Sequence, residues 1–148
     1  MRYRLTLGLA LALGVACDGR DFIGPPGSCV QATGSVTATV NTSGSVTFDW
    51  DPACAVALLL IEEDATDMWA ITAPGLDDTS TEAANVITPP VTYGTVPAGA
   101  EQDAPAIPLV PGTTYELILW KMVPVNSTVQ CQQRFQNACL LTVHPFQR

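Results

Sequence analysis

Residues 109–123, LVPGTTYELILWKMV, limit the possible folds of this chain more than any other segment. Pro111 and Gly112 favour a turn, and the residues after them are of the β-branched, aromatic and aliphatic kinds that fill strands. Apolar side chains occupy both faces of the expected strand, namely Tyr115, Leu117 and Leu119 on one face and Ile118, Trp120 and Met122 on the other. We therefore predict a turn followed by a long strand that must be covered on both sides.

Two further segments alternate between apolar and polar residues, which predicts half-buried strands. They are residues 36–40 and 45–50, and the turn sequence Thr42-Ser43-Gly44 lies between them, so we expect a β-hairpin. Pro52 ends the second strand because proline cannot donate to a ladder. Three apolar residues of that strand share the face expected to be buried: Val46, Phe48 and Trp50.

The rest of the chain offers more short extended segments. Residues 55–61 are apolar at every position, which indicates a central strand, with a short buried helix as the alternative. Prolines within residues 85–96 and 101–109 favour positions at sheet edges. Further strands are expected at 68–72 and 140–143, and a surface loop at 73–84. Seven or eight short strands and no convincing helix predict an all-β sandwich.

The first seventeen residues have the features of an export signal. Arg2 and Arg4 precede a run of small and apolar residues that is too short for a permanent transmembrane helix but suits a secretory signal. The run ends in GVAC, residues 14–17, which resembles the lipobox of bacterial lipoproteins, although that motif usually has Leu in place of Gly14. The resemblance implies lipidation at Cys17; the alternative is ordinary cleavage after Ala16, which would release a soluble protein.

These features divide the chain into three parts. Residues 1–17 are the expected lipoprotein signal peptide with its lipobox cysteine. Residues 18–28 are rich in Gly and Pro, which predicts a flexible tether. Residues 29–148 form the expected β-sandwich domain.

Four cysteines follow the tether: Cys29, Cys54, Cys131 and Cys139. An even number in an exported chain favours two disulfides. A zinc site is the alternative, but no two of these cysteines have the close spacing of such sites and His144 is the one histidine of the chain, so we expect no metal.

The composition is strongly acidic, with a formal net charge of −8. Removal of the signal would also remove Arg2 and Arg4, leaving four basic residues against fourteen acidic ones. Such a charge argues against nucleic acid or anionic head groups as partners. We therefore expect contact with a membrane through the lipid anchor alone.

Two motifs resemble the fibronectin type III domain and its immunoglobulin-like relatives. VTFDWDP, residues 46–52, is similar to that family's second strand, and LVPGTTYELIL, residues 109–119, is similar to its sixth. The resemblance implies a single immunoglobulin-like sandwich of seven to eight strands. It also implies a tyrosine corner at Tyr115, whose hydroxyl would reach nearby backbone. The cysteines and the poorly matching residues 73–104 depart from the family pattern.

That topology would bring all four cysteines to one end of the sandwich. Three pairings are possible. We favour Cys29 with Cys54 and Cys131 with Cys139, because each bridge then joins neighbours in sequence.

No combination of residues predicts an enzyme. His144 stands beside Pro145 without an acidic neighbour, which disfavours a general base. The acidic clusters at 62–64 and 77–82 could pair as in glycosidases, but such runs usually form solvated loops. We therefore expect no catalytic residue and no cofactor.

The second apolar face of the strand at 113–123 suggests an interaction patch on the outside of its sheet. Its candidate residues are Trp69, Ile118, Trp120 and Met122. Either these residues bind a partner, or residues 73–104 or Phe22-Ile23 cover them. We expect a non-enzymatic bacterial envelope lipoprotein whose sandwich is a binding or structural module for an unknown protein or envelope component. The alternatives are a carrier of a small apolar ligand and a hydrolase.

Overall fold

The computed structural model of the chain describes residues 29, 36–76, 84–123, 131–132 and 137–148. Within these residues all the regular structure is β-strand. The strands in chain order are β1 (Thr37–Asn41), β2 (Thr47–Asp51), β3 (Leu58–Glu63), β4 (Thr66–Thr72), β5 (Val91–Thr92), β6 (Glu101–Ala104), β7 (Thr114–Met122) and β8 (Ala138–Gln147).

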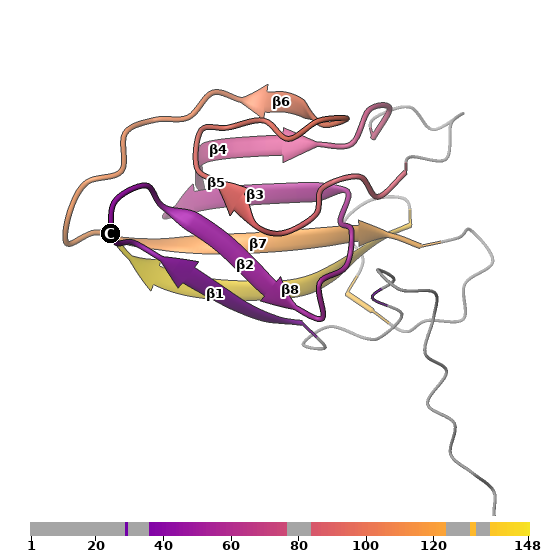
Figure 1. Ribbon diagram of the computed structural model, residues 1–148, viewed down its shortest axis with the longest axis horizontal. Helices are drawn as coiled ribbons and strands as arrows, with labels where there is room; N and C mark the ends of the chain where they lie inside the picture. Colours follow the sequence, from indigo (N-terminus) through magenta and orange to yellow (C-terminus); the bar gives the residue numbers. More distant parts are fainter. Residues whose placement is uncertain (1–28, 30–35, 77–83, 124–130, 133–136) are drawn as a thin grey trace, which may run out of the picture.

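The strands form two antiparallel sheets, one with the order β1-β2-β5 and the other with the order β6-β4-β3-β7-β8. Figure 1 shows the smaller sheet in front of the larger one, with β1 and β2 crossing over β7 and β8. The prediction of an all-β protein with two packed sheets is confirmed. β7, the strand predicted to be covered on both sides, lies inside the larger sheet, between β3 and β8.

The space between the sheets is filled by a core rich in aromatic rings. The Phe48 ring of β2 lies 6.4 Å from that of Trp69 on β4 and 5.6 Å from that of Phe146 on β8, measured between centroids. Aliphatic residues of the larger sheet complete this core, among them Leu59, Ile61, Ile71, Leu117 and Leu119, all fully buried. Phe48 thus joins the two sheets, as expected for the apolar side of the first hairpin.

Residues 55–61 form a strand rather than a helix, but the strand begins later than predicted. β3 starts at Leu58, while Val56 makes an isolated bridge to Ile87. At the other end β3 continues to Glu63, and a two-residue turn with positive φ at Asp64 and Ala65 leads into β4. That turn geometry matches the twist of a two-stranded hairpin, which explains why the acidic residues remain part of the strand.

The last strand is longer than predicted. β8 covers Ala138–Gln147, and Pro145 lies within it opposite Glu116 of β7. A proline is compatible with this position because β8 is an edge strand, where the missing N–H faces away from the neighbour. The other proline-rich segments also lie at edges, since β5 and β6 are the outermost strands of their sheets.

Tyr115, at the start of β7, is fully buried, and its hydroxyl oxygen accepts a hydrogen bond of 2.8 Å from the backbone N–H of Val110. This is the kind of contact that the resemblance implies for Tyr115. It ties the segment before β7 to the core, because the Tyr115 ring also packs against Phe146, with 5.7 Å between centroids.

The replacement Tyr115→Phe should lower the free energy of unfolding by about 1 kcal/mol, because the Val110 N–H loses its acceptor while the ring packing is kept. Urea denaturation of the two proteins measures the difference. An unchanged midpoint would show that the hydrogen bond contributes nothing to stability.

Candidate functional site

Both disulfides lie at one end of the sandwich, which we call the disulfide pole. Cys29 is bonded to Cys54 and Cys131 to Cys139, with 5.4 Å between the Cα atoms of each pair. Lys121 connects the two bridges: it is paired with Cys139 in the sheet, and its Nζ donates a 2.6 Å hydrogen bond to the Cys29 carbonyl. The pairing is the one favoured from sequence, and Cys139 lies in β8.

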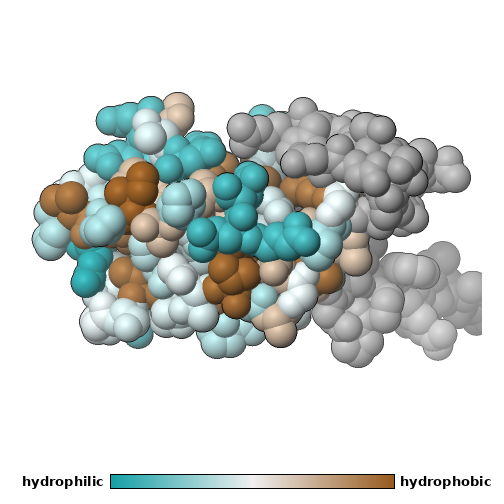
Figure 2. Space-filling view, turned by 90° about the horizontal axis from the view of Figure 1, so that it is seen from above, coloured by the Kyte–Doolittle hydropathy of each residue, from teal (hydrophilic) through white to brown (hydrophobic). Residues whose placement is uncertain are grey.

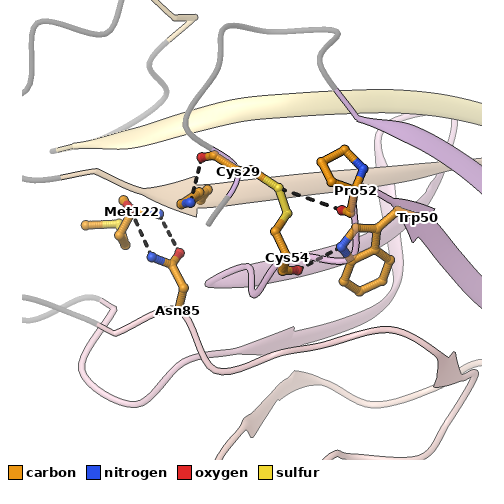
Figure 3. Close-up of a disulfide and its surroundings, with 7 residues drawn as sticks. Cys29, Trp50, Pro52, Cys54, Asn85 and Met122 are labelled. Carbon is orange, nitrogen blue, oxygen red and sulfur yellow. Dashed lines mark hydrogen bonds between the residues drawn. A yellow bond between two sulfur atoms is a disulfide. The ribbon is translucent and has the colours of Figure 1, made fainter. Parts of the chain in front are cut away.

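Side chains hold the backbone around the first disulfide in place (Figure 3). The indole N–H of Trp50 donates a 2.8 Å hydrogen bond to the Cys54 carbonyl. Asn85 bonds to the backbone of Met122 twice, since its amide nitrogen donates to the carbonyl and its oxygen accepts from the N–H, at 3.0 and 2.9 Å. Asn85 therefore takes the role of a neighbouring strand at the end of β7.

Lys121 is the unexpected residue at this pole, because it is 9% exposed in a protein region that is otherwise apolar. Burial lowers the pKa of its ammonium group, since the charged form loses hydration. One sequence pattern points to the burial of Lys121, which is the single charged residue inside the apolar run ILWKMV, but the pattern does not indicate its partner. Lys121 is not among the site residues predicted from sequence.

The three patch candidates on β7 lie together on the outer face of the larger sheet and are buried. Ile118, Trp120 and Met122 are 7, 5 and 6% exposed. They belong to a second apolar cluster with residues of β3, β4 and β8, which also includes Ala73 and Leu76, and Val86 and Ala104 pack against it. Of the two expectations for this face, the structure favours a cover, part of which comes from these four described residues within 73–104.

Trp69 does not belong to this patch, which corrects the sequence prediction. It is fully buried between the sheets, where its ring lies 5.2 Å from that of Tyr93. The reason is register: Trp69 lies opposite Ile61, which faces the inner core, and an irregularity follows between Ile61 and Glu62. Met68, the residue before Trp69, also belongs to the inner core.

Beyond the buried cluster, the outer face becomes acidic. Glu62 of β3 is opposite Asp67 of β4 on one side and Glu116 of β7 on the other. Directly opposed like charges repel one another in a sheet. The same concentration of negative charge disfavours an anionic partner at this part of the face. Within the described ranges, no group of three or more acidic, His or Cys side chains could hold a metal ion.

The residues weighed for catalysis are not assembled into a site in the part of the chain that the structure describes. His144 lies on the edge strand β8 opposite Leu117. Glu62 and Glu63 end β3, and Asp64 is in the turn after it. Asp77, Asp78, Glu82, Cys17 and the tether 18–28 lie outside the described residues.

Comparisons of the chain with protein-family models, with curated proteins and with solved structures gave no significant match. Nor do the described residues include a helix with the length and apolar character needed to cross a membrane. The two disulfides are typical of proteins from an oxidising, exported environment.

Two glutamate substitutions on the outer face should separate its buried part from its exposed part. Trp120→Glu should destabilise the domain by several kcal/mol, about 3 or more, because it buries a carboxyl group and leaves a cavity. Val143→Glu is the matched control: Val143 pairs with Ile118 on the same face but is 44% exposed, so its loss should be below about 1 kcal/mol. Equal losses of stability for the two variants in thermal unfolding would contradict the burial of Trp120.

Lys121→Met should alter how stability depends on pH. Because the pKa of Lys121 is lowered in the native protein, Lys121 loses its proton at a lower pH in the folded state than in the unfolded state. Stability should therefore rise with pH from the lowered pKa toward the usual pKa of 10.5, and the methionine variant should lack this rise.

Urea midpoints of both proteins, in the form beginning at Asp18, test this between neutral pH and about pH 10, the ordinary tyrosine pKa. Above that pH Tyr93 acts in the opposite direction, because burial raises its pKa to about 12 and its stabilising contribution is lost as the pH rises. Parallel curves for the two proteins below pH 10 would show that Lys121 is not the responsible group.

Proposed function

We propose that this protein is an exported bacterial envelope lipoprotein, anchored through Cys17, whose sandwich is a non-enzymatic binding or structural module. Its partner would be a protein or another envelope component. Two observations support the proposal: the lipobox-like sequence at residues 14–17, and the two disulfides that crosslink the domain.

The observation that carries this proposal is the fixed position of Cys29. Its sulfur is bonded to Cys54 and its carbonyl to Lys121, so the chain enters the domain at the disulfide pole. From Cys17 to Cys29 is 29 − 17 = 12 residues, which span at most about 40 Å when fully extended. A lipid on Cys17 would therefore keep the disulfide pole near the membrane and leave the opposite pole free for a partner.

We further propose that the sandwich belongs with the immunoglobulin-like and fibronectin type III domains. Two observations support this: the sheets divide the strands as β1-β2-β5 against a larger sheet containing β4-β3-β7-β8, and Tyr115 bonds to backbone five residues earlier. Binding rather than catalysis is the common use of such sandwiches in cell-surface proteins. Accordingly, we assign no catalytic role to His144.

Metabolic labelling with an alkyne-tagged fatty acid tests the anchor. The wild-type protein should carry the label and enter the detergent phase, whereas Cys17→Ser should carry none, because the thiol is the expected site of lipidation. Cys29→Ser with Cys54→Ser is the control that removes two cysteines and leaves the lipobox intact. An unlabelled wild-type protein, released in soluble form after cleavage, would contradict the lipoprotein assignment.

A further inference from the structure

A pocket lies at the pole opposite the disulfides. Its volume is about 240 Å³, and its lining residues are Gly44, Ser45, Val46, Tyr93, Pro108, Leu109 and Arg148. β8 connects the two poles, since it starts at Ala138 next to Cys139 and ends at Gln147, a length of roughly 30 Å. A domain tethered through Cys29 would present this pocket away from the membrane.

The guanidinium of Arg148 is held at this pocket by backbone contacts. Its Nη1 donates a 2.6 Å hydrogen bond to the Thr42 carbonyl, and the residue's own N–H donates to the Thr113 carbonyl at 3.2 Å. The Gly112 N–H donates to the Arg148 carbonyl at 2.6 Å. The side chain is thereby positioned between the turn that joins β1 to β2 and the turn that precedes β7.

Arg148 is also unusual in its charge. The described part of the chain contains two Lys or Arg residues, and the other, Lys121, is buried. Arg148 makes no ion pair with a carboxylate of the described residues, and its one hydrogen bond from the guanidinium leaves four of five N–H donors for a ligand. A positioned guanidinium that pairs with no carboxylate side chain of the described residues therefore borders the pocket.

The other lining residues are uncharged, and they present polar and apolar surface in similar amounts. Val46 is buried, and Leu109 packs against the inner core. The Tyr93 hydroxyl lies 2.9 Å from the Met68 carbonyl and 2.7 Å from the Ile107 carbonyl, so its hydrogen is engaged within the protein and its ring forms a wall. Burial keeps the phenol neutral by raising its pKa to about 12.

We propose that this pocket binds a small ligand in which one carboxylate is joined to an apolar group of the size of a single ring. Guanidinium and carboxylate form paired, charge-assisted hydrogen bonds, and the side chains of Val46, Tyr93 and Leu109 would contact the apolar part of the ligand. A cavity of about 150 Å³ holds benzene, so the present volume suits one ring and its carboxylate. The acidic surface of the protein disfavours ligands with several negative charges.

This inference rests on the proposed function as a binding module and names its ligand class. The carboxylate could belong to a free organic acid or to the end of a peptide, and both present the same chemistry to Arg148. A pocket that binds no carboxylate would leave the fatty-acid label on Cys17 unchanged, so the two proposals can be contradicted separately.

The test is a titration of the mature ¹⁵N-labelled protein, as purified from the producing cell, followed by amide NMR. The probes are 3-phenylpropionate, 3-phenylpropanol and 3-phenylpropylamine, which differ only in the end group. The carboxylate should bind with a Kd on the order of 1 mM, as expected for so small a ligand. It should shift the amides of Gly44, Ser45 and Tyr93, and bind at least about tenfold more tightly than the alcohol. The amine should not bind.

Arg148→Gln should weaken binding of the carboxylate about tenfold or more, and Arg148→Lys should retain part of it. Arg134→Gln removes the same charge elsewhere in the chain and should leave binding unchanged. If Arg148→Gln fails to fold, Ser45→Leu, which narrows the pocket at an exposed position, should abolish binding instead.

A final probe, N-acetylglycylphenylalanine, separates the two sources of the carboxylate. Tighter binding of this peptide than of 3-phenylpropionate supports a peptide end, and the reverse supports a free acid. The proposal is overturned if no carboxylate binds up to about 10 mM, if the alcohol binds equally well, or if Arg148→Gln binds like the wild type.

Discussion

The structure depends on the burial of β7 on both of its faces. From Leu117 to Met122 every residue of this strand is buried, including Lys121. One face needs the smaller sheet as a partner, which gives the sandwich its inner core. The other face needs a separate cover, and Ala73, Leu76 and Val86 contribute to it. Burial of apolar surface is the main favourable term in folding. Two packed sheets alone would bury the inner face of β7 and leave its outer face exposed to solvent.

Much of the fold followed from sequence because its signals were local. Alternation at residues 45–50 predicted the buried face of β2, and the prolines before β5 and after β6 predicted edge strands. The orientation of Trp69 could not be predicted in this way, because it depends on the pairing of Trp69 with Ile61 of the neighbouring strand, which faces the inner core. β8 is longer than the predicted residues 140–143, and it can include Pro145 because an edge position accommodates a proline.

The candidate sites show the same division between local and long-range information. The disulfide partners could be favoured from their order in the chain, and both bridges are present. Lys121 and Arg148, by contrast, acquire their roles from backbone carbonyls far away in sequence, those of Cys29 and Thr42. A single cation in an apolar run or at the end of a strand carries no signal of such a partner.

The contact between Asn85 and Met122 has a consequence for the dynamics of the outer cover. Both backbone groups of Met122 are bonded to one side chain that enters from the segment before β5. The amide hydrogen of Met122 can exchange with solvent only when that side chain moves away. Its exchange rate relative to that of the sheet interior therefore reports whether the cover separates from β7 by itself or only when the whole domain unfolds.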